Sequence, residues 1–92
     1  MNKSMTRVEN MVSSKGNTVA NQFLIYTEKG VYFQSYGSVI AFKPYTGKTQ
    51  LDSEYWDYSQ TTGKYRNIFL DENKATTEAK IKNGTYELVN LN

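Results

Sequence analysis

One stretch of twelve residues, 55–66, concentrates the side chains that could bind another molecule. It contains the only tryptophan, three of the eight tyrosines, three hydroxyl side chains and two cations. Hydroxyls and cations next to a helix N-terminus can hold a phosphate or a carboxylate, whereas Tyr, Trp and Arg dominate the hot spots of protein–protein interfaces. We therefore predict a partner-binding site here, formed by Tyr55, Trp56, Tyr58, Ser59, Thr61, Thr62, Lys64, Tyr65 and Arg66.

The same hydroxyls have a purely structural interpretation. Ser59, Thr61 and Thr62 immediately precede a helical spacing of apolar residues, and hydroxyls at that position cap the unpaired N–H groups of a helix. One hydroxyl is enough for a cap, so the others stay available for a ligand. Gly63 does not make this a phosphate-binding P-loop, because the glycine-rich run and the Lys-Ser/Thr pair are missing.

Three acidic residues lie just before and within this stretch. Asp52, Glu54 and Asp57 could ligate Mg²⁺ or Ca²⁺, which prefer oxygen, or two of them could act as acid and base in glycoside hydrolysis. Strand alternation would direct Asp52 and Glu54 to one side and leave Asp57 elsewhere. A solvated charged edge is the favoured interpretation, and we predict no metal site, cofactor or catalytic residue.

The composition restricts the chemistry further. The 92 residues contain no cysteine and no histidine, so thiol nucleophiles, a Ser-His-Asp triad and Cys/His zinc sites are excluded. Residues 1–50 carry a net charge of +4 and residues 51–92 a net charge of −2. Seven aromatic residues interleaved with five cations could also stack bases and contact phosphates. A nucleic-acid-binding module is thus the alternative to a protein-binding one.

The spacing of apolar residues predicts the elements that position these side chains. Met5, Val8, Met11 and Val12 recur at three-to-four spacing and predict an N-terminal amphipathic helix over residues 4–14. Alternation and turn residues predict five extended segments. They are residues 19–27, 31–34, 38–43, 48–51 and 85–91.

Two short helices are expected in the C-terminal half. One covers about residues 61–70, and the next begins at Asn73, a good N-cap, and ends at Asn83-Gly84. The length fits one domain, residues 1–92. We expect an α+β fold with an antiparallel sheet of four to five strands, and neither a signal peptide nor a membrane span, because no apolar run is long enough.

Three segments together resemble a known group of proteins: residues 32–42, Leu51-Asp52, and residues 55–70 with the Ser-x-Thr-Thr element at residues 59–62. The sequence is similar over about residues 17–92 to a family of small uncharacterised proteins encoded by tailed bacteriophages. The resemblance implies a phage origin and a bacterial host cytoplasm, and it carries no activity. The resulting expectation is a non-enzymatic phage accessory protein that binds a bacterial host protein, inhibiting host metabolism or an antiviral defence system.

Overall fold

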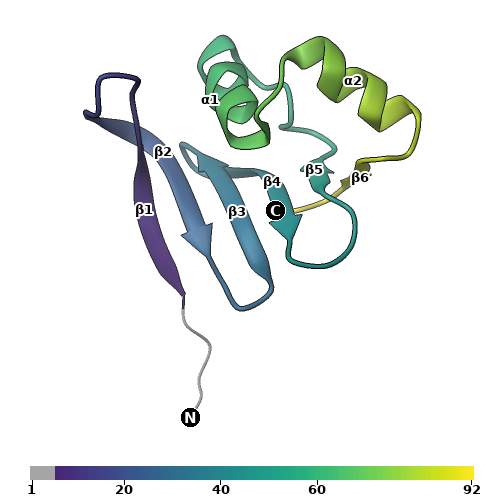
Figure 1. The fold of residues 1–92 in the computed structure, drawn as a ribbon, viewed down its shortest axis with the longest axis horizontal. Coiled ribbons are helices and arrows are strands. Elements are labelled where there is room, and N and C mark those ends of the chain that lie inside the picture. The colour runs from purple at the N-terminus through teal and green to yellow at the C-terminus, as the bar shows by residue number, and fades with distance from the viewer. Residues whose placement is uncertain (1–5) are drawn as a thin grey trace.

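Six strands and two helices make up residues 6–92, the part of the chain that this computed structural model describes (Figure 1). In chain order they are β1 (Arg7–Val12), β2 (Thr18–Tyr26), β3 (Gly30–Ser35), β4 (Ser38–Pro44), β5 (Gln50–Asp52), α1 (Gln60–Leu70), α2 (Lys74–Lys82) and β6 (Glu87–Val89). The predicted α+β class is confirmed. Neither helix of this part of the chain is long and apolar enough to cross a membrane.

The sheet is mixed, and its strand order follows the sequence from β1 to β6. Neighbours from β1 to β5 pair antiparallel, while β6 pairs parallel to β5. A parallel pair needs a long crossover connection, and α1 and α2 together supply it. The prediction of a purely antiparallel sheet with four or five strands was therefore wrong in both respects.

The predicted N-terminal helix is also wrong, because residues 7–12 form β1; Ser4 and Met5 lie outside the described residues. Residues three apart share one face of a helix but lie on opposite faces of a strand. Val8 is 58% exposed and Met11 is 5% exposed, as the strand requires. Pairing with β2 decides the outcome, with Val8 opposite Ile25.

β2 contains a bulge that the alternation did not predict. The register with β1 shifts between Asn10 and Val12, and Asn21 adopts a left-handed conformation with φ of 65°. The Asn10 side chain donates a hydrogen bond to the Val19 carbonyl across the irregularity, at 3.0 Å. Asn is among the residues that tolerate this conformation, so the chain can bend here without a glycine.

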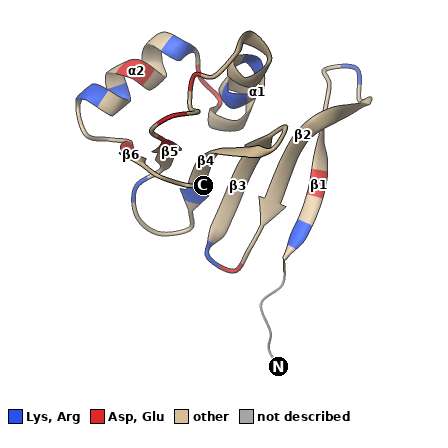
Figure 2. Cartoon of the chain, turned by 180° about the vertical axis from the view of Figure 1, so that it is seen from behind, with Lys and Arg blue, Asp and Glu red and all other residues tan. Residues whose placement is uncertain are grey.

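The core lies between the sheet and α1. The strands contribute four fully buried residues, Phe33, Ile40, Ala41 and Leu51. The Phe33 ring packs against Phe69 of α1 with centroids 5.7 Å apart. Both helices were predicted nearly to the residue. In Figures 1 and 2 they lie together beside β3 to β6, while β1 and β2 extend away from them.

The end of the chain closes the sheet. The predicted strand over residues 85–91 is shorter, Glu87–Val89, and the last residues continue along β5 toward β4. The Asn92 side chain accepts a hydrogen bond from the Val39 N–H and donates one to the Val39 carbonyl, at 2.8 and 2.9 Å. The Asn92 side chain therefore satisfies the backbone N–H and carbonyl of Val39 in β4, which no residue of β5 pairs with.

Candidate functional site

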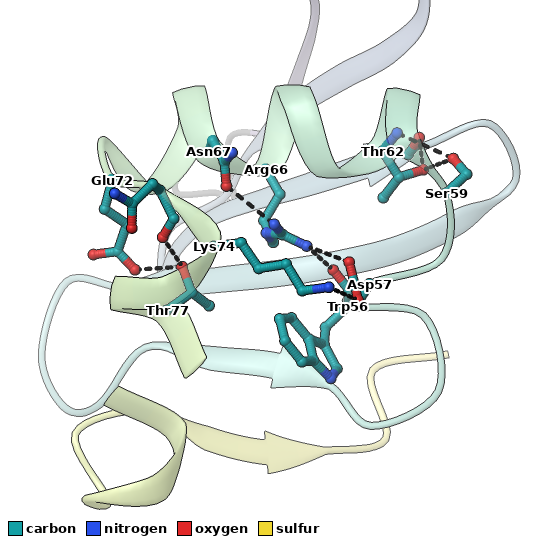
Figure 3. Close-up of polar contacts among 11 residues, drawn as sticks. Trp56, Asp57, Ser59, Thr62, Arg66, Asn67, Glu72, Lys74 and Thr77 are labelled. Carbon is teal, nitrogen blue, oxygen red and sulfur yellow. Dashed lines mark hydrogen bonds and ion pairs between the residues drawn. The ribbon is translucent and has the colours of Figure 1, made fainter. Parts of the chain in front are cut away.

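The hydroxyls of the predicted site divide into a helix cap, a buried bond and one exposed group (Figure 3). Ser59 is the N-cap of α1, and its Oγ accepts the Thr62 N–H at 3.2 Å. The Thr62 side chain is fully buried, and its hydroxyl is hydrogen bonded to the hydroxyl of Ser35 in β3 at 2.8 Å. Ser59 and Thr61 are both exposed, and of these two Ser59 already serves as the cap. The capping interpretation thus accounts for Ser59, and Thr62 joins the helix to the sheet.

Arg66 is a buried support rather than a surface cation (Figure 3). Its side chain is 1% exposed. One terminal nitrogen donates to the Trp56 carbonyl at 2.8 Å and to Asp57 Oδ1 at 3.2 Å, and the other donates to Asn67 Oδ1 at 3.0 Å. The guanidinium carbon lies 5.2 Å from the centre of the Trp56 ring. Arg66 therefore fixes the segment between β5 and α1 onto the helix.

The aromatic residues of the site differ in accessibility. Tyr65 is buried in the core, while Tyr55 and Trp56 are half-buried and pack against it. Tyr58 is 60% exposed, and its ring meets Tyr55 edge-on with centroids 5.5 Å apart. Edge-to-face pairs stabilise one relative orientation of two rings. Tyr58 is thus an exposed aromatic side chain with a defined support.

A polar cleft of about 390 Å³ lies along the first half of α1 and reaches the start of α2. Its lining residues are Asp57, Ser59, Gln60, Gly63, Lys64, Arg66, Asn67 and Lys74. Lys74 contacts Asp57 at 2.7 Å, and Arg66 contacts the same carboxylate. Burial opposes ionisation of Asp57, but these two cations outweigh it and hold its pKa below the ordinary value. Two of the three cations that line the cleft therefore already share one carboxylate of the protein.

The three acidic residues considered as a metal or catalytic site do not converge. Asp52 is buried and accepts the N–H groups of Glu54, Tyr55 and Leu91 at 2.8–3.0 Å. Burial opposes its ionisation, but these bonds and one from Asn92 outweigh it and lower its pKa. Glu54 is exposed, and Asp57 is engaged with cations. Within residues 6–92 no three acidic side chains are placed to hold a metal ion.

A second buried polar cluster was not anticipated from the sequence. Glu72, between the helices, accepts hydrogen bonds from Thr77 at 2.6 Å and from Lys80 at 2.7 Å. Burial opposes ionisation of Glu72, but these two donors outweigh it and lower its pKa. Tyr86 lies 3.5 Å from the Lys80 nitrogen, and burial raises the pKa of its hydroxyl. The eight-residue separation of Glu72 and Lys80 is not a spacing that predicts a helical ion pair.

A row of exposed side chains continues from the site along α1. Thr61, Lys64 and Ile68 follow one another at spacings of three and four and are all exposed. Ile68 is 52% exposed and borders an apolar groove of about 340 Å³ beside β1 to β4. The other residues that line this groove are Met11, Leu24, Tyr26, Val31, Lys43 and Phe69.

Lys and Arg residues are spread over the turns, helices and strand ends rather than gathered in one stripe (Figure 2). Of the ten Lys and Arg residues within residues 6–92, four are held in ion pairs, among them Arg7 with Glu9 at 2.9 Å. Lys43 donates to the Phe69 carbonyl at the end of α1, at 2.7 Å. A nucleic-acid backbone would therefore find few neighbouring cations on one face.

One family model matches the sequence, and it covers residues 6–84. The matched region includes β1 to β5 and both helices. No curated protein and no solved structure matches the chain. Since the family model covers most of the sequence, the chain belongs to the family of unknown function DUF8033.

Proposed function

We propose that this protein is a non-enzymatic protein-binding module. Following the resemblance to proteins of tailed bacteriophages, we further propose that it is a phage accessory protein. In that role it binds a bacterial host protein in the host cytoplasm, and so inhibits host metabolism or an antiviral defence system. The proposed contact surface consists of Tyr58, its support Tyr55, and the exposed residues Thr61, Lys64 and Ile68 of α1.

The accessibility of Tyr58 on a fixed loop is the observation that carries this proposal. Exposed aromatic residues are favoured anchors because they bury a large area and lose few rotamers. Asp52 accepts the backbone N–H groups of Glu54 and Tyr55, and Arg66 donates to the Trp56 carbonyl and to Asp57. A loop held in this way reduces the ordering cost of association, which strengthens binding.

The buried members of the original site have a different role in this proposal. Thr62, Tyr65 and Arg66 are buried, so in this proposal they position the loop and the helix and do not contact the partner. Trp56 combines both properties, because its carbonyl and ring hold Arg66 while its side chain is half-buried. A loss of binding in Trp56→Ala could therefore not be distinguished from a loss of the folded structure.

Tyr58→Ala is the sharper test, and Tyr45→Ala is its matched control. Tyr45 is 64% exposed, close to the 60% of Tyr58, but it lies in the turn after β4. Proteins captured from a bacterial lysate by the wild-type chain are identified and titrated calorimetrically with both variants. We expect Tyr58→Ala to weaken binding by about 2 kcal/mol, as at a hot spot, and Tyr45→Ala to leave it unchanged. Equal affinity for both variants would refute the assigned surface.

Nucleic-acid binding is tested with the same preparation. Fluorescence anisotropy of labelled DNA and RNA at low and near-physiological salt should show no binding. A complex that weakens steeply with salt would instead indicate phosphate contacts, and it would replace the protein-binding proposal.

A further inference from the structure

Asn83 and Gly84 form the only Asn-Gly pair of the sequence, and they lie where α2 ends. Asn83 is the C-cap of α2, and Gly84 follows it with a φ of 84°. Both residues are exposed, as is Thr85. A Cβ added to Gly84 would meet nothing within 4 Å among the described residues. No side chain, its own or a neighbour's, therefore crowds the backbone of Gly84 on that side.

The side-chain amide of Asn83 is held by the residue after the glycine. Its Oδ1 accepts the Thr85 N–H at 2.9 Å and the Thr85 hydroxyl at 2.6 Å. Two donors on an amide oxygen stabilise the negative charge that this oxygen gains when a nucleophile adds to the carbon. The Gly84 nitrogen can be that nucleophile, because its attack on the Asn83 Cγ closes a succinimide ring. Its own hydrogen bond to the Ile81 carbonyl is long, at 3.3 Å.

We propose that Asn83 is a self-modification site, at which the side-chain amide is lost as ammonia and the residue becomes aspartate or isoaspartate. Hydroxide removes the Gly84 N–H proton, the nitrogen bonds to the Asn83 Cγ, and the Cγ–Nδ2 bond breaks. Nδ2 takes a proton from water and leaves as ammonia, and a succinimide ring remains.

Water opens this ring at either of its carbonyl carbons, and the ring nitrogen regains its proton. Addition of water at Cγ gives aspartate. Addition at the backbone carbonyl carbon of residue 83 gives isoaspartate, whose main chain runs through Cβ and Cγ. Water is the only co-reactant, and no group is oxidised or reduced.

Asn73, at the other end of α2, provides a comparison within the same chain. It is exposed too, and its Oδ1 accepts the Thr76 N–H at 2.9 Å. The residue that follows it is Lys74, which has a Cβ beside the attacking nitrogen and belongs to the helix. Glycine has more conformational freedom than any other residue, so ring closure is favoured at Asn83 and not at Asn73.

The isoaspartate product has a longer main chain in the connection from α2 to β6 (Figure 1). In this connection Tyr86 is buried in the core, and its N–H donates to the Lys80 carbonyl at 3.0 Å. The Glu87 N–H donates to the Thr49 carbonyl at 3.0 Å, where β6 begins to pair with β5. An additional main-chain carbon this close displaces these bonds, so isoaspartate should destabilise the fold, whereas aspartate keeps the original chain length.

This inference goes beyond the proposed function and does not rest on it, because no residue of the proposed contact surface lies in α2 or β6. Incubation of the full chain at neutral and at mildly alkaline pH, followed by peptide mass spectrometry, tests it. The peptide that contains Asn83 should lose its amide, faster at the higher pH because hydroxide starts the reaction, while Asn73 keeps its amide. An isoaspartate methyltransferase should label the same peptide.

Gly84→Asn is the matched variant, because Asn tolerates a positive φ and the added side chain extends into open space. Circular dichroism checks that this variant folds. The loss of the Asn83 amide should then fall to the level measured at Asn73. Ion exchange separates the aged wild-type chain by its additional negative charge, and its Tm should lie below that of Asn83→Asp.

Each of three results would overturn the proposed reaction. An Asn83 amide that persists as long as that of Asn73 shows that the site does not react in the folded chain. A Gly84→Asn variant that reacts as fast as the wild type excludes the proposed nucleophile. Aspartate without isoaspartate indicates direct hydrolysis. Equal Tm values for the aged chain and Asn83→Asp would contradict the effect on β6. None of these measurements involves a partner, so failure of the protein-binding proposal is distinguishable from failure of this one.

Discussion

Replacing Arg66 by Met should destabilise the fold, although Arg66 lies in the stretch predicted to bind a partner. The substitution keeps a long apolar side chain and removes three hydrogen bonds, to the Trp56 carbonyl, Asp57 and Asn67. Hydrogen bonds to charged groups contribute about 1.5–3 kcal/mol each, and losing one partner of a buried ion pair costs about 3–5 kcal/mol.

Two features place the loss at the low end of the range of about 3–5 kcal/mol for a broken buried ion pair. Asp57 keeps Lys74 as a second cation at 2.7 Å, and its side chain is 37% exposed, so water screens it when Arg66 is absent. Burying the Met side chain in the same space recovers part of the apolar packing. We therefore expect a loss of about 3 kcal/mol, a large share of the 5–15 kcal/mol typical of a domain.

Urea denaturation measures this loss directly. Trp56 is the only tryptophan, and it contacts Arg66, so its fluorescence reports on the affected segment. Circular dichroism follows the whole fold in parallel. In a domain of this size, 3 kcal/mol corresponds to a decrease in Tm of about 12–24 °C. Arg66→Lys keeps the charge without the planar fork and should lose about 2 kcal/mol.

Lys64→Met is the control, because it removes a cation from an exposed position of the same helix. It should change stability by less than about 0.5 kcal/mol. If Arg66→Met is as stable as Lys64→Met, Arg66 is not a buried support in solution. It would then return to the candidate surface contacts, and the assignment of structural roles within residues 55–66 would be wrong.

Three further predictions concern stability. Asp52 and Glu72 have pKa values below their ordinary 3.8 and 4.5. The stability contributed by their ionised forms is therefore present above about pH 5 and lost as the pH falls through the folded values. Urea midpoints should fall in acid, and less steeply in Asp52→Asn; an unchanged pH profile in that variant would contradict the role of Asp52. Gly30→Ala should cost about 2 kcal/mol or more in urea denaturation, because the added Cβ would collide with the backbone carbonyl oxygen of Lys43; a neutral effect would rule out this close approach. Ser59→Ala should lower the thermal midpoint by the equivalent of about 1 kcal/mol through loss of the α1 cap, and Ser59→Thr should retain it.

Local chemistry was sufficient to predict the two helices and five of the six strands within residues 6–92. Ser59 and Asn73 cap α1 and α2 through an N–H three residues further along, and this interaction needs no other part of the chain. The turns at Gly30 and at Tyr36-Gly37 likewise depend on nearby residues. The N-terminal segment could not be predicted in this way, because Val8 and Met11 fit a helix or a strand equally well until β2 pairs with them.

The division of the candidate site into surface and interior was decided only by the tertiary structure. The composition of residues 55–66 placed Tyr58, Lys64 and Arg66 in one candidate site. These three residues are neighbours along the chain, but the tertiary structure gives them different roles. Arg66 became a buried support because residues 56 and 57 fold back over α1 and offer it a carbonyl and a carboxylate. Contacts between distant residues also decide which apolar residues of the sheet share a face, since strand pairing sets that alignment. Residue type determines what a side chain can bind, and packing determines whether it is free to do so.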